Sequence, residues 1–191
     1  MFSPSLRRRA TSRAGVLAGT LAALAIALAA CGADKQDENE PEGEFKVDVV
    51  SASFPGRQHL ADEATLRLEI QNKDSREIPN LAVTVDGFGQ RRDDPTLSDP
   101  ERPVWILNSP PRNSNTALTN TWTVGPVPAG ETRTLDWNVT AVRAGTYSIR
   151  YRVAAGVHGK AIAESADGSG PARGSFIARV SRAPRPLDQE Q

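Results

Sequence analysis

One segment in the middle of the chain groups four acidic residues within nine positions, and such carboxylates could bind a hard cation. They are Asp93, Asp94, Asp99 and Glu101. Loops of extracellular β-domains offer oxygen ligands of this kind to calcium, which takes about six to eight of them. The segment lacks the glycine at the sharp turn and the alternating ligands of an EF-hand loop. It therefore gives a calcium-site hypothesis without a recognised motif.

The residues that could support catalysis are few and scattered. The only histidines, His59 and His158, both lie beside turn residues, and their spacing does not match a metal-ligand motif. With one cysteine in the chain, a zinc site with two thiolates cannot form. No Gly-x-Ser-x-Gly elbow is present to activate a serine. The sequence therefore predicts a protein that is not an enzyme and that uses no cofactor.

The N-terminus has the composition of an export signal. Residues 1–13 contain four arginines and no acid, and residues 14–30 form the uncharged run AGVLAGTLAALAIALAA. A basic segment followed by an apolar one is typical of a secretory signal peptide. The alternative is a permanent transmembrane helix, but 17 alanine-rich residues are short and weakly apolar for that role. We therefore expect residues 1–30 to be a signal peptide.

The end of the apolar run, Leu28-Ala29-Ala30-Cys31, resembles the lipobox of bacterial lipoproteins. The resemblance implies that diacylglyceryl is transferred to the thiol of Cys31 and that signal peptidase II cleaves between Ala30 and Cys31. Two acyl chains suffice for stable anchoring, where a single chain does not. The resemblance therefore implies a palmitate-type anchor to the cell membrane, with the protein on the extracytoplasmic face.

The segment after the anchor differs in composition from the rest of the chain. Residues 32–44, GADKQDENEPEGE, contain six acids, one lysine and no aliphatic side chain larger than alanine. Such a segment cannot bury enough apolar surface to fold. We expect residues 31–44 to be a disordered tether that reaches about 40 Å, although a charged binding tail is an alternative. The folded domain is expected at 45–182, and residues 183–191 are expected to be a disordered tail.

From Phe45 onward apolar and polar residues alternate, as they do in half-buried β-strands. A break in this alternation indicates a bulge near Val49. Strands are predicted at 45–54, 64–70, 81–85, 117–124, 135–141, 147–153, 160–164 and 174–181. Trp122 and Trp137 are in phase with the apolar faces of their strands. Short strands separated by frequent turns predict an all-β, Ig-like antiparallel sandwich of about seven to nine strands, with an antiparallel barrel as the alternative.

Two features make the sandwich prediction more specific. Gly145-Thr-Tyr147-Ser-Ile149 resembles the tyrosine corner of immunoglobulin-like domains, in which the hydroxyl bonds back to the preceding turn. The stretches LRLEIQNKDSREIPNLAVTVD and PVPAGETRTLDWNVTAVRAGTYSIRYRV together resemble bacterial CARDB and related Ig-like adhesion modules. These resemblances imply a fold. Function on such folds depends on the sites they carry.

A long connection between two predicted strands is the candidate partner-binding region. Residues 86–116 mix aromatic, basic and proline residues, and connections of this length usually bind something or are disordered. Its candidate contact residues are Arg91, Arg92, Trp105 and Arg112, since tryptophan and arginine often anchor interfaces. The alternative is that residues 104–107 form another short strand whose Trp105 or Ile106 packs into the core.

The charge balance bears on the partner. The chain has 23 basic and 23 acidic residues, and without the four arginines of the signal peptide it is mildly acidic. Nucleic-acid binding normally requires clustered Lys and Arg on one face, so we expect no nucleic-acid partner. The predicted function is a lipid-anchored binding or structural module of the cell envelope, which contacts a protein or polysaccharide. The alternative is a surface lipoprotein that binds calcium or a small molecule.

Overall fold

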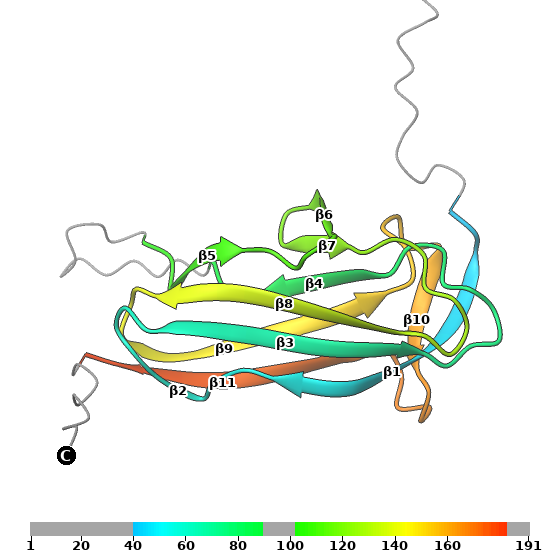
Figure 1. Ribbon diagram of the computed structural model, residues 1–191. Helices are drawn as coiled ribbons and strands as arrows, with labels where there is room; N and C mark the ends of the chain where they lie inside the picture. The colour runs from blue at the N-terminus through cyan, green and yellow to red at the C-terminus, as the bar shows by residue number, and fades with distance from the viewer. Residues whose placement is uncertain (1–39, 90–101, 183–191) are drawn as a thin grey trace, which may run out of the picture. The chain divides into compact units, whose positions relative to one another are not determined.

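The computed structural model describes residues 40–89 and 102–182, which form two stacked β-sheets (Figure 1). In this part of the chain no helix is long and apolar enough to cross a membrane. In chain order the strands are β1 (Gly43–Ser53), β2 (Arg57–His59), β3 (Glu63–Asn72), β4 (Ala82–Asp86), β5 (Trp105–Ser109), β6 (Asn115–Leu118), β7 (Thr121–Thr123), β8 (Thr132–Ala141), β9 (Gly145–Ala154), β10 (Ala161–Ser165) and β11 (Arg173–Ser181).

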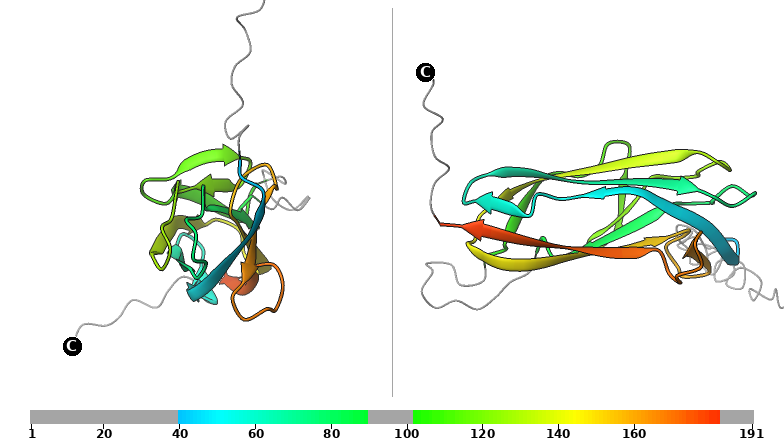
Figure 2. Two further views of the ribbon diagram at one scale, coloured as in Figure 1. Left: turned by 90° about the vertical axis from the view of Figure 1, so that its right-hand side faces the viewer. Right: turned by 90° about the horizontal axis from the view of Figure 1, so that it is seen from below.

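Sheet 1 has the strand order β10-β1-β3-β8-β5, and sheet 2 has the order β2-β11-β9-β4-β7-β6. Figure 2 shows the two layers lying one over the other. Neighbouring strands are antiparallel except at one edge of each sheet, where β10 pairs in parallel with β1 and β2 pairs in parallel with β11. The all-β sandwich is thus confirmed, but its sheets are mixed rather than purely antiparallel.

The core lies between the two sheets and follows the alternation of the sequence. On β3 the side chains of Leu66, Leu68 and Ile70 are fully buried, while the residues between them face outward. Trp137 of sheet 1 meets Trp122 of sheet 2 edge to face, with 5.7 Å between ring centroids. Such tilted aromatic pairs are favoured by the ring quadrupole. The prediction that both tryptophans belong to the core is confirmed.

Residues 40–89 and 102–182 contain eleven strands instead of the predicted seven to nine or so, because several short strands carry no clear alternation. The predicted strand 117–124 is two strands, β6 and β7, which form a hairpin. Asn120 lies in the turn between them with φ of 58°, a left-handed conformation that asparagine tolerates better than most residues. β2 was not predicted, since its three residues are too few to show a period.

Two local predictions are confirmed by the backbone. The pairing of β1 with β3 shifts register between Val49 and Ser51, which places a bulge where the alternation breaks. The Tyr147 hydroxyl donates a hydrogen bond to the Ala144 carbonyl oxygen at 2.7 Å, as in a tyrosine corner. A Cβ at Gly145 would lie only 2.6 Å from that hydroxyl, which explains why the smallest residue precedes the corner.

The N-terminal boundary of the domain needs a correction. Residues 40–44 were assigned to a disordered tether, yet β1 begins at Gly43 and Glu40 is only 6% exposed. The Glu40 carboxylate accepts four backbone N–H groups of the β9–β10 loop, and these contacts supply the stabilisation that apolar residues would otherwise give. The signal peptide, Ala30, Cys31, the rest of the tether and the tail at 183–191 lie outside the described residues.

Candidate functional site

The outer face of sheet 2 is built by the same alternation that builds the core. On β9 the side chains of Ile149, Tyr151 and Val153 are buried, so Arg150 and Arg152 between them face outward and are exposed. β11 repeats the pattern, with buried Ala178 and Val180 and with exposed arginines at the alternate positions 173 and 179. Each strand therefore presents two arginines to solvent.

Strand register brings these arginines together. Arg152 lies directly opposite Arg173, and Arg179 lies opposite Arg57 of β2. Arg150 is flanked by Asp86 on β4. Side chains at directly opposed positions on one sheet face have Cβ atoms about 4.5–5.5 Å apart in antiparallel pairs. We call this surface the arginine face, and its charged members are Arg57, Arg150, Arg152, Arg173, Arg179 and Asp86.

In the described part of the chain the arginines of this face form no ion pairs, although Asp86 lies opposite Arg150 in the strand register. Within residues 40–89 and 102–182 none of the five forms a salt bridge or a side-chain hydrogen bond. Like charges directly opposite each other on a sheet, such as Arg152 and Arg173, are destabilising. Guanidinium groups in such an arrangement can donate charge-assisted hydrogen bonds to an anion.

Three of these arginines line a recess of about 680 Å³. Its lining residues are Asp86, Arg150, Tyr151, Arg152, Arg173, Gly174 and Ser175. A Cβ at Gly174 would lie 2.5 Å from the Tyr151 hydroxyl oxygen, so glycine there leaves room for the ring. Burial raises the pKa of the Tyr151 hydroxyl, which therefore stays neutral beside the arginines. Guanidinium forks of this kind bind phosphate, sulfate or carboxylate in two-point contacts.

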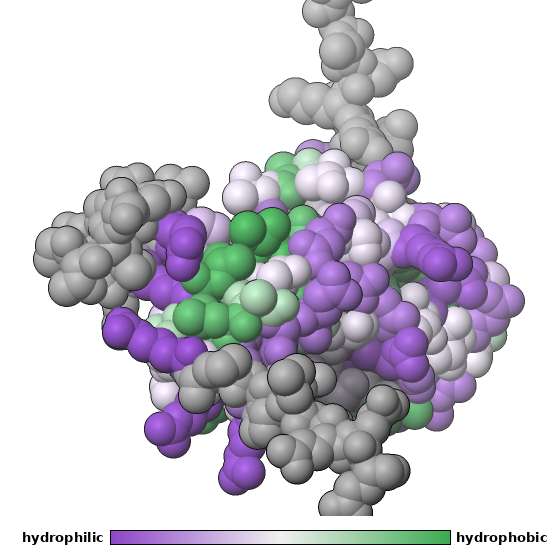
Figure 3. Space-filling model, turned by 60° about the vertical axis from the view of Figure 1, so that its left-hand side comes forward, coloured by the Kyte–Doolittle hydropathy of each residue, from purple (hydrophilic) through white to green (hydrophobic). Residues whose placement is uncertain are grey.

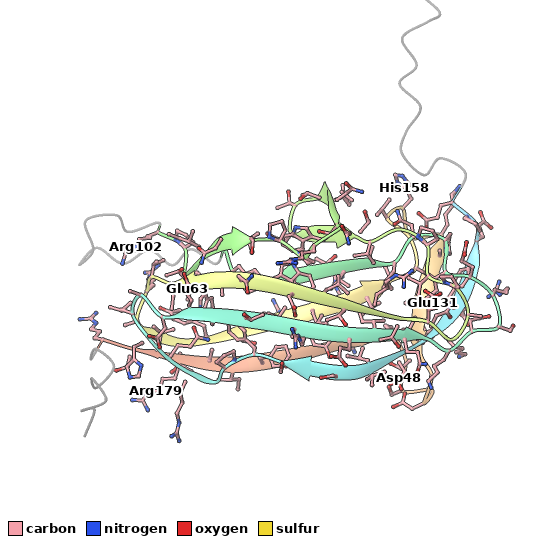
Figure 4. All side chains as sticks on the ribbon, in the orientation of Figure 1. Asp48, Glu63, Arg102, Glu131, His158 and Arg179 are labelled. Atoms are coloured by element: carbon pink, nitrogen blue, oxygen red, sulfur yellow. The ribbon has the colours of Figure 1, made fainter. Side chains whose placement is uncertain are left out.

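The outer face of sheet 1 has the opposite character. Its outward positions hold six acids against two bases, namely Glu44, Asp48, Glu63, Glu69, Asp136 and Glu164 against Lys46 and Arg67. Here opposite charges meet, since the Arg67 Nε and Nη2 atoms donate to the two Asp136 carboxylate oxygens at 2.7 and 2.8 Å. Figure 4 labels Asp48 and Glu63 on this sheet and Arg179 on the other. We call this surface the acidic face.

Trp105, one of the four predicted contact residues, belongs to the core. It opens β5, is 2% exposed, and donates its indole N–H to the side-chain oxygen of Gln58 at 2.8 Å. Its ring also lies edge to face with that of Tyr147, with 5.6 Å between centroids. The alternative of a short core strand at 104–107 is therefore the one the structure shows, as β5, and a contact role for Trp105 stays a prediction.

The other predicted site residues are not brought together in the described structure. Arg112 is exposed in the turn between β5 and β6. Arg91, Arg92, Asp93, Asp94, Asp99 and Glu101 lie outside the described residues, as do Ala30 and Cys31. Within the ranges described, no group of three or more histidine, cysteine or acidic side chains is placed to hold a metal ion.

The described part of the 86–116 connection lines an apolar groove of about 340 Å³. Phe88, Trp105, Ile106, Leu107 and Trp122 form most of its walls, and Asn120 adds one amide. Figure 3 shows hydrophobic residues gathered among hydrophilic ones on the end of the domain that it displays. The groove offers little to orient a charged ligand, so it differs in chemistry from the arginine face.

Reasoning from sequence missed the arginine face because each arginine, taken alone, was a water-facing residue of an amphipathic strand. The signal that could have revealed it is the pair of stretches YSIRYRV and RGSFIAR, whose arginines are separated by an even number of positions and so lie on one face of each strand. The expectation that excluded nucleic acid assumed that basic residues are not clustered. That premise is wrong, because a net charge near zero conceals two faces of opposite sign.

No known family model matches the chain, and no curated protein sequence matches it. Among solved structures it is similar to the CARDB domain of a Pyrococcus furiosus protein in complex with di-metal ions, at 16% identity over 73% of this chain and 91% of that one, with a TM-score of 0.45. It is also similar to the cupredoxin domain of amoB from Nitrosocaldus yellowstonii, at 13% identity over 78% of this chain and 98% of that one, with a TM-score of 0.41. A third similar structure is the cohesin module from a Clostridium perfringens family 33 glycoside hydrolase. The identity is 10% over 73% of this chain and 98% of that one, with a TM-score of 0.44.

Proposed function

We propose that this chain is a lipid-anchored, non-catalytic binding module of the bacterial cell envelope, and that it binds an anionic partner through the arginine face. The observation that carries the proposal is the set of five exposed arginines on one sheet face, which have no acidic partners in the described part of the chain. The six acids of the acidic face make the domain a charge dipole, so an anionic partner is attracted to one side and repelled from the other.

The chemistry of the recess supports binding rather than catalysis. Arg150, Arg152 and Arg173 supply guanidinium groups, which have five hydrogen-bond donors each and no acceptor. The single carboxylate of the lining, Asp86, lies opposite Arg150 in the register of β4 and β9. Such a set holds an anion in place, but it does not pair a nucleophile with a base.

The proposed anchor is supported by the lipobox sequence, which ends in Cys31, and by the basic and apolar segments before it. Export through such a signal places the domain outside the cytoplasm. There a module with a single cysteine depends on its hydrophobic core for stability. A lipid at Cys31 would keep the arginine face close to the anionic components of the envelope.

The anchor is tested by intact mass and membrane fractionation of the protein expressed in a bacterium, with Cys31→Ser as the variant. We expect wild type to begin at Cys31, to carry added acyl mass and to sediment with membranes, whereas the variant does neither. A wild-type chain that retains residues 1–30 without lipid would overturn the anchor.

The arginine face is tested by retention of the mature chain on immobilised dextran sulfate, an anionic polymer used as the probe. We expect the Arg152→Ala, Arg173→Ala double variant to elute at clearly lower salt than wild type. The matched control replaces Lys46 and Lys73, two exposed lysines outside the arginine face, by alanine. Elution of the two double variants at the same salt concentration would contradict the proposal, since retention would then depend on net charge alone.

A further inference from the structure

Glu40 fixes the place at which the N-terminal segment joins the domain. One carboxylate oxygen accepts the backbone N–H groups of Val157 and His158 at 3.0 and 2.7 Å, and the other accepts those of Lys160 and Ala161 at 3.0 and 2.7 Å. Successive backbone N–H groups that converge in this way form a nest for an anion. The donors outweigh the burial of the carboxyl, which acts to raise its pKa, so the net pKa of Glu40 is lowered.

This attachment limits how far the domain can lie from the lipid. Glu40 is nine positions after Cys31 in the sequence, and a chain spans at most about 3.3 Å per residue. The β9–β10 loop, residues 155–160, can therefore lie no more than about 30 Å from a lipid carried on Cys31. A tether that ran freely to residue 44 would allow about 40 Å.

The arginine recess adjoins the loop that holds Glu40. β9 ends beside β10 and the start of β1 (Figure 1). Arg152 of β9 lines a smaller hollow of about 230 Å³ together with Gly156, Val157 and Gly159 of the loop. Arg152 also lies opposite Arg173 in the larger recess. The tethered part of the domain and the arginine recess are therefore neighbours.

The arginine face also exposes large apolar side chains. Ile177 lies between the outward positions of Arg179 and Ser175 on β11 and is 71% exposed. Leu118 of β6 is 57% exposed and pairs with Thr121, on the same side of sheet 2 as Thr84. Apolar side chains among arginines suit a membrane surface, where headgroup phosphates lie above acyl chains. A soluble polyanion has no comparable apolar layer.

From these contacts we propose that the arginine face binds the anionic phospholipid headgroups of the membrane to which Cys31 is anchored, so that the domain lies against that membrane. The inference rests on the proposed function and names the ligand class of the same site. Three observations favour this surface, namely the short reach set by Glu40, the exposed Ile177 and Leu118, and arginines that form no ion pairs within the described residues. Arginines at an anionic leaflet strengthen association about five-fold each.

The experiment uses the mature chain from residue 31 with Cys31→Ser, so that no acyl chain contributes to binding. Sedimentation is measured with vesicles of phosphatidylglycerol and phosphatidylcholine in equal parts, and with vesicles of phosphatidylcholine alone. We expect binding to the anionic vesicles at low salt and no binding to the neutral ones. Replacing Arg150, Arg152 and Arg173 by alanine should weaken binding roughly a hundred-fold, the product of three five-fold steps.

The matched control replaces Lys46, Lys73 and Arg133 by alanine, which removes the same charge from positions outside the arginine face. We expect it to bind within a few-fold of the parent. Circular dichroism and thermal unfolding establish that both triple variants are folded. Equal loss in the two triple variants would contradict the proposal. Ile177→Thr, which leaves the charge unchanged, should weaken vesicle binding without changing retention on dextran sulfate.

Failure of this inference can be told apart from failure of the proposed function. If the parent is retained on dextran sulfate through its arginines but does not bind anionic vesicles, the ligand is a soluble or polymeric anion, and the membrane assignment is overturned. If it binds neither probe, the arginine face is not an anion site at all. Lipidation of Cys31 is measured separately, by mass, and does not depend on either result.

Discussion

The two outer faces of the sandwich follow the same alternation of polar and apolar residues, yet they differ in which charges lie opposite each other across strands. On the acidic face Arg67 is paired with Asp136, and the Thr65 hydroxyl donates to the Asn138 side-chain oxygen at 2.8 Å. On the arginine face Arg152 meets another arginine, Arg173. The acidic face contains a cross-strand pair of opposite charges, whereas the arginines of the other face form no such pair among the described residues. The alternation of polar and apolar residues determines which side chains face solvent. The strand register determines whether a charged side chain has an opposite charge beside it or stays available to a ligand.

The largest effect is expected where the sheets that carry the two faces meet. Trp137 is fully buried and packs on Trp122 across the core. Trp137→Ala should lower the free energy of unfolding by about 3–5 kcal/mol, because it removes an aromatic side chain and leaves a cavity. Urea denaturation followed by circular dichroism measures the loss, and both faces should be lost in one transition.

Trp137→Phe is the matched variant for this test. In the described part of the chain the indole N–H of Trp137 has no hydrogen-bond partner, so phenylalanine removes a buried group that is not satisfied. It should cost clearly less than alanine. A phenylalanine variant as unstable as the alanine variant would mean that ring packing does not hold the sheets together.

The next effect concerns the edge where the N-terminal segment joins both the β9–β10 loop and β1. Glu40→Gln should lower the free energy of unfolding by about 1–3 kcal/mol, because an amide nitrogen would face backbone donors that now meet a carboxylate. Thermal unfolding at neutral pH measures the change. Glu42→Gln, at an exposed position two residues away, is the control and should leave stability unchanged.

The Glu40 contribution should depend on pH in a definite direction. The pKa of Glu40 is lowered in the folded protein, so its stabilisation is fully present above the unfolded-state pKa of about 4.3 and is lost as the pH falls through the lower folded-state value. Wild type and Glu40→Gln should therefore converge in stability at acid pH. Parallel curves between neutral and acid pH would show that the carboxylate charge contributes nothing.

A smaller effect tests the contrast between the faces directly. Arg173→Glu would place an acid opposite Arg152 and give sheet 2 the kind of cross-strand pair that Arg67 and Asp136 form on sheet 1. We expect stability to rise by about 0.2–1 kcal/mol at low salt and anion binding to fall. Urea midpoints at low and high salt measure the first effect. A variant that is less stable at low salt would argue against repulsion between Arg152 and Arg173.

The smallest effect is expected for Ile177→Thr, which changes an exposed apolar residue of the arginine face without changing its charge. Since Ile177 is 71% exposed, the free energy of unfolding should change by no more than about 0.5 kcal/mol. Thermal unfolding checks this. A larger loss would assign Ile177 a part in the fold and would remove it as an argument for a membrane contact.

Much of the fold could be predicted because it depends on neighbours in the sequence. The alternation around Leu66 and Leu68 required a half-buried strand, and the break near Val49 required a bulge. The Tyr147 hydroxyl reaches a carbonyl only three residues away, so its role was also visible locally. The hairpin at Asn120 was missed because a single asparagine in a polar run does not separate a turn from a continuing strand.

The candidate site could not be predicted in the same way. Arg152 and Arg173 are twenty-one residues apart in the sequence and opposed in space, and no local pattern states which strands pair. Glu40 was assigned to a tether because the segment that contains it, residues 32–44, has no large apolar side chain that could be buried in a core. Its partners are backbone N–H groups more than a hundred residues away, and these are invisible in a sequence.

The sequence by itself determined that this chain contains an all-β domain and which residues of each strand face the core. The export signal with its lipobox stays a prediction from the same sequence. These follow from the two-residue period of a strand and from composition, which are properties of adjacent residues. Only the tertiary structure decided that the outward arginines share one face, that Trp105 is core, and that Glu40 is held by the β9–β10 loop. The physical reason is that register and strand order are set by long-range pairing, and charge becomes a surface property only when that pairing is fixed.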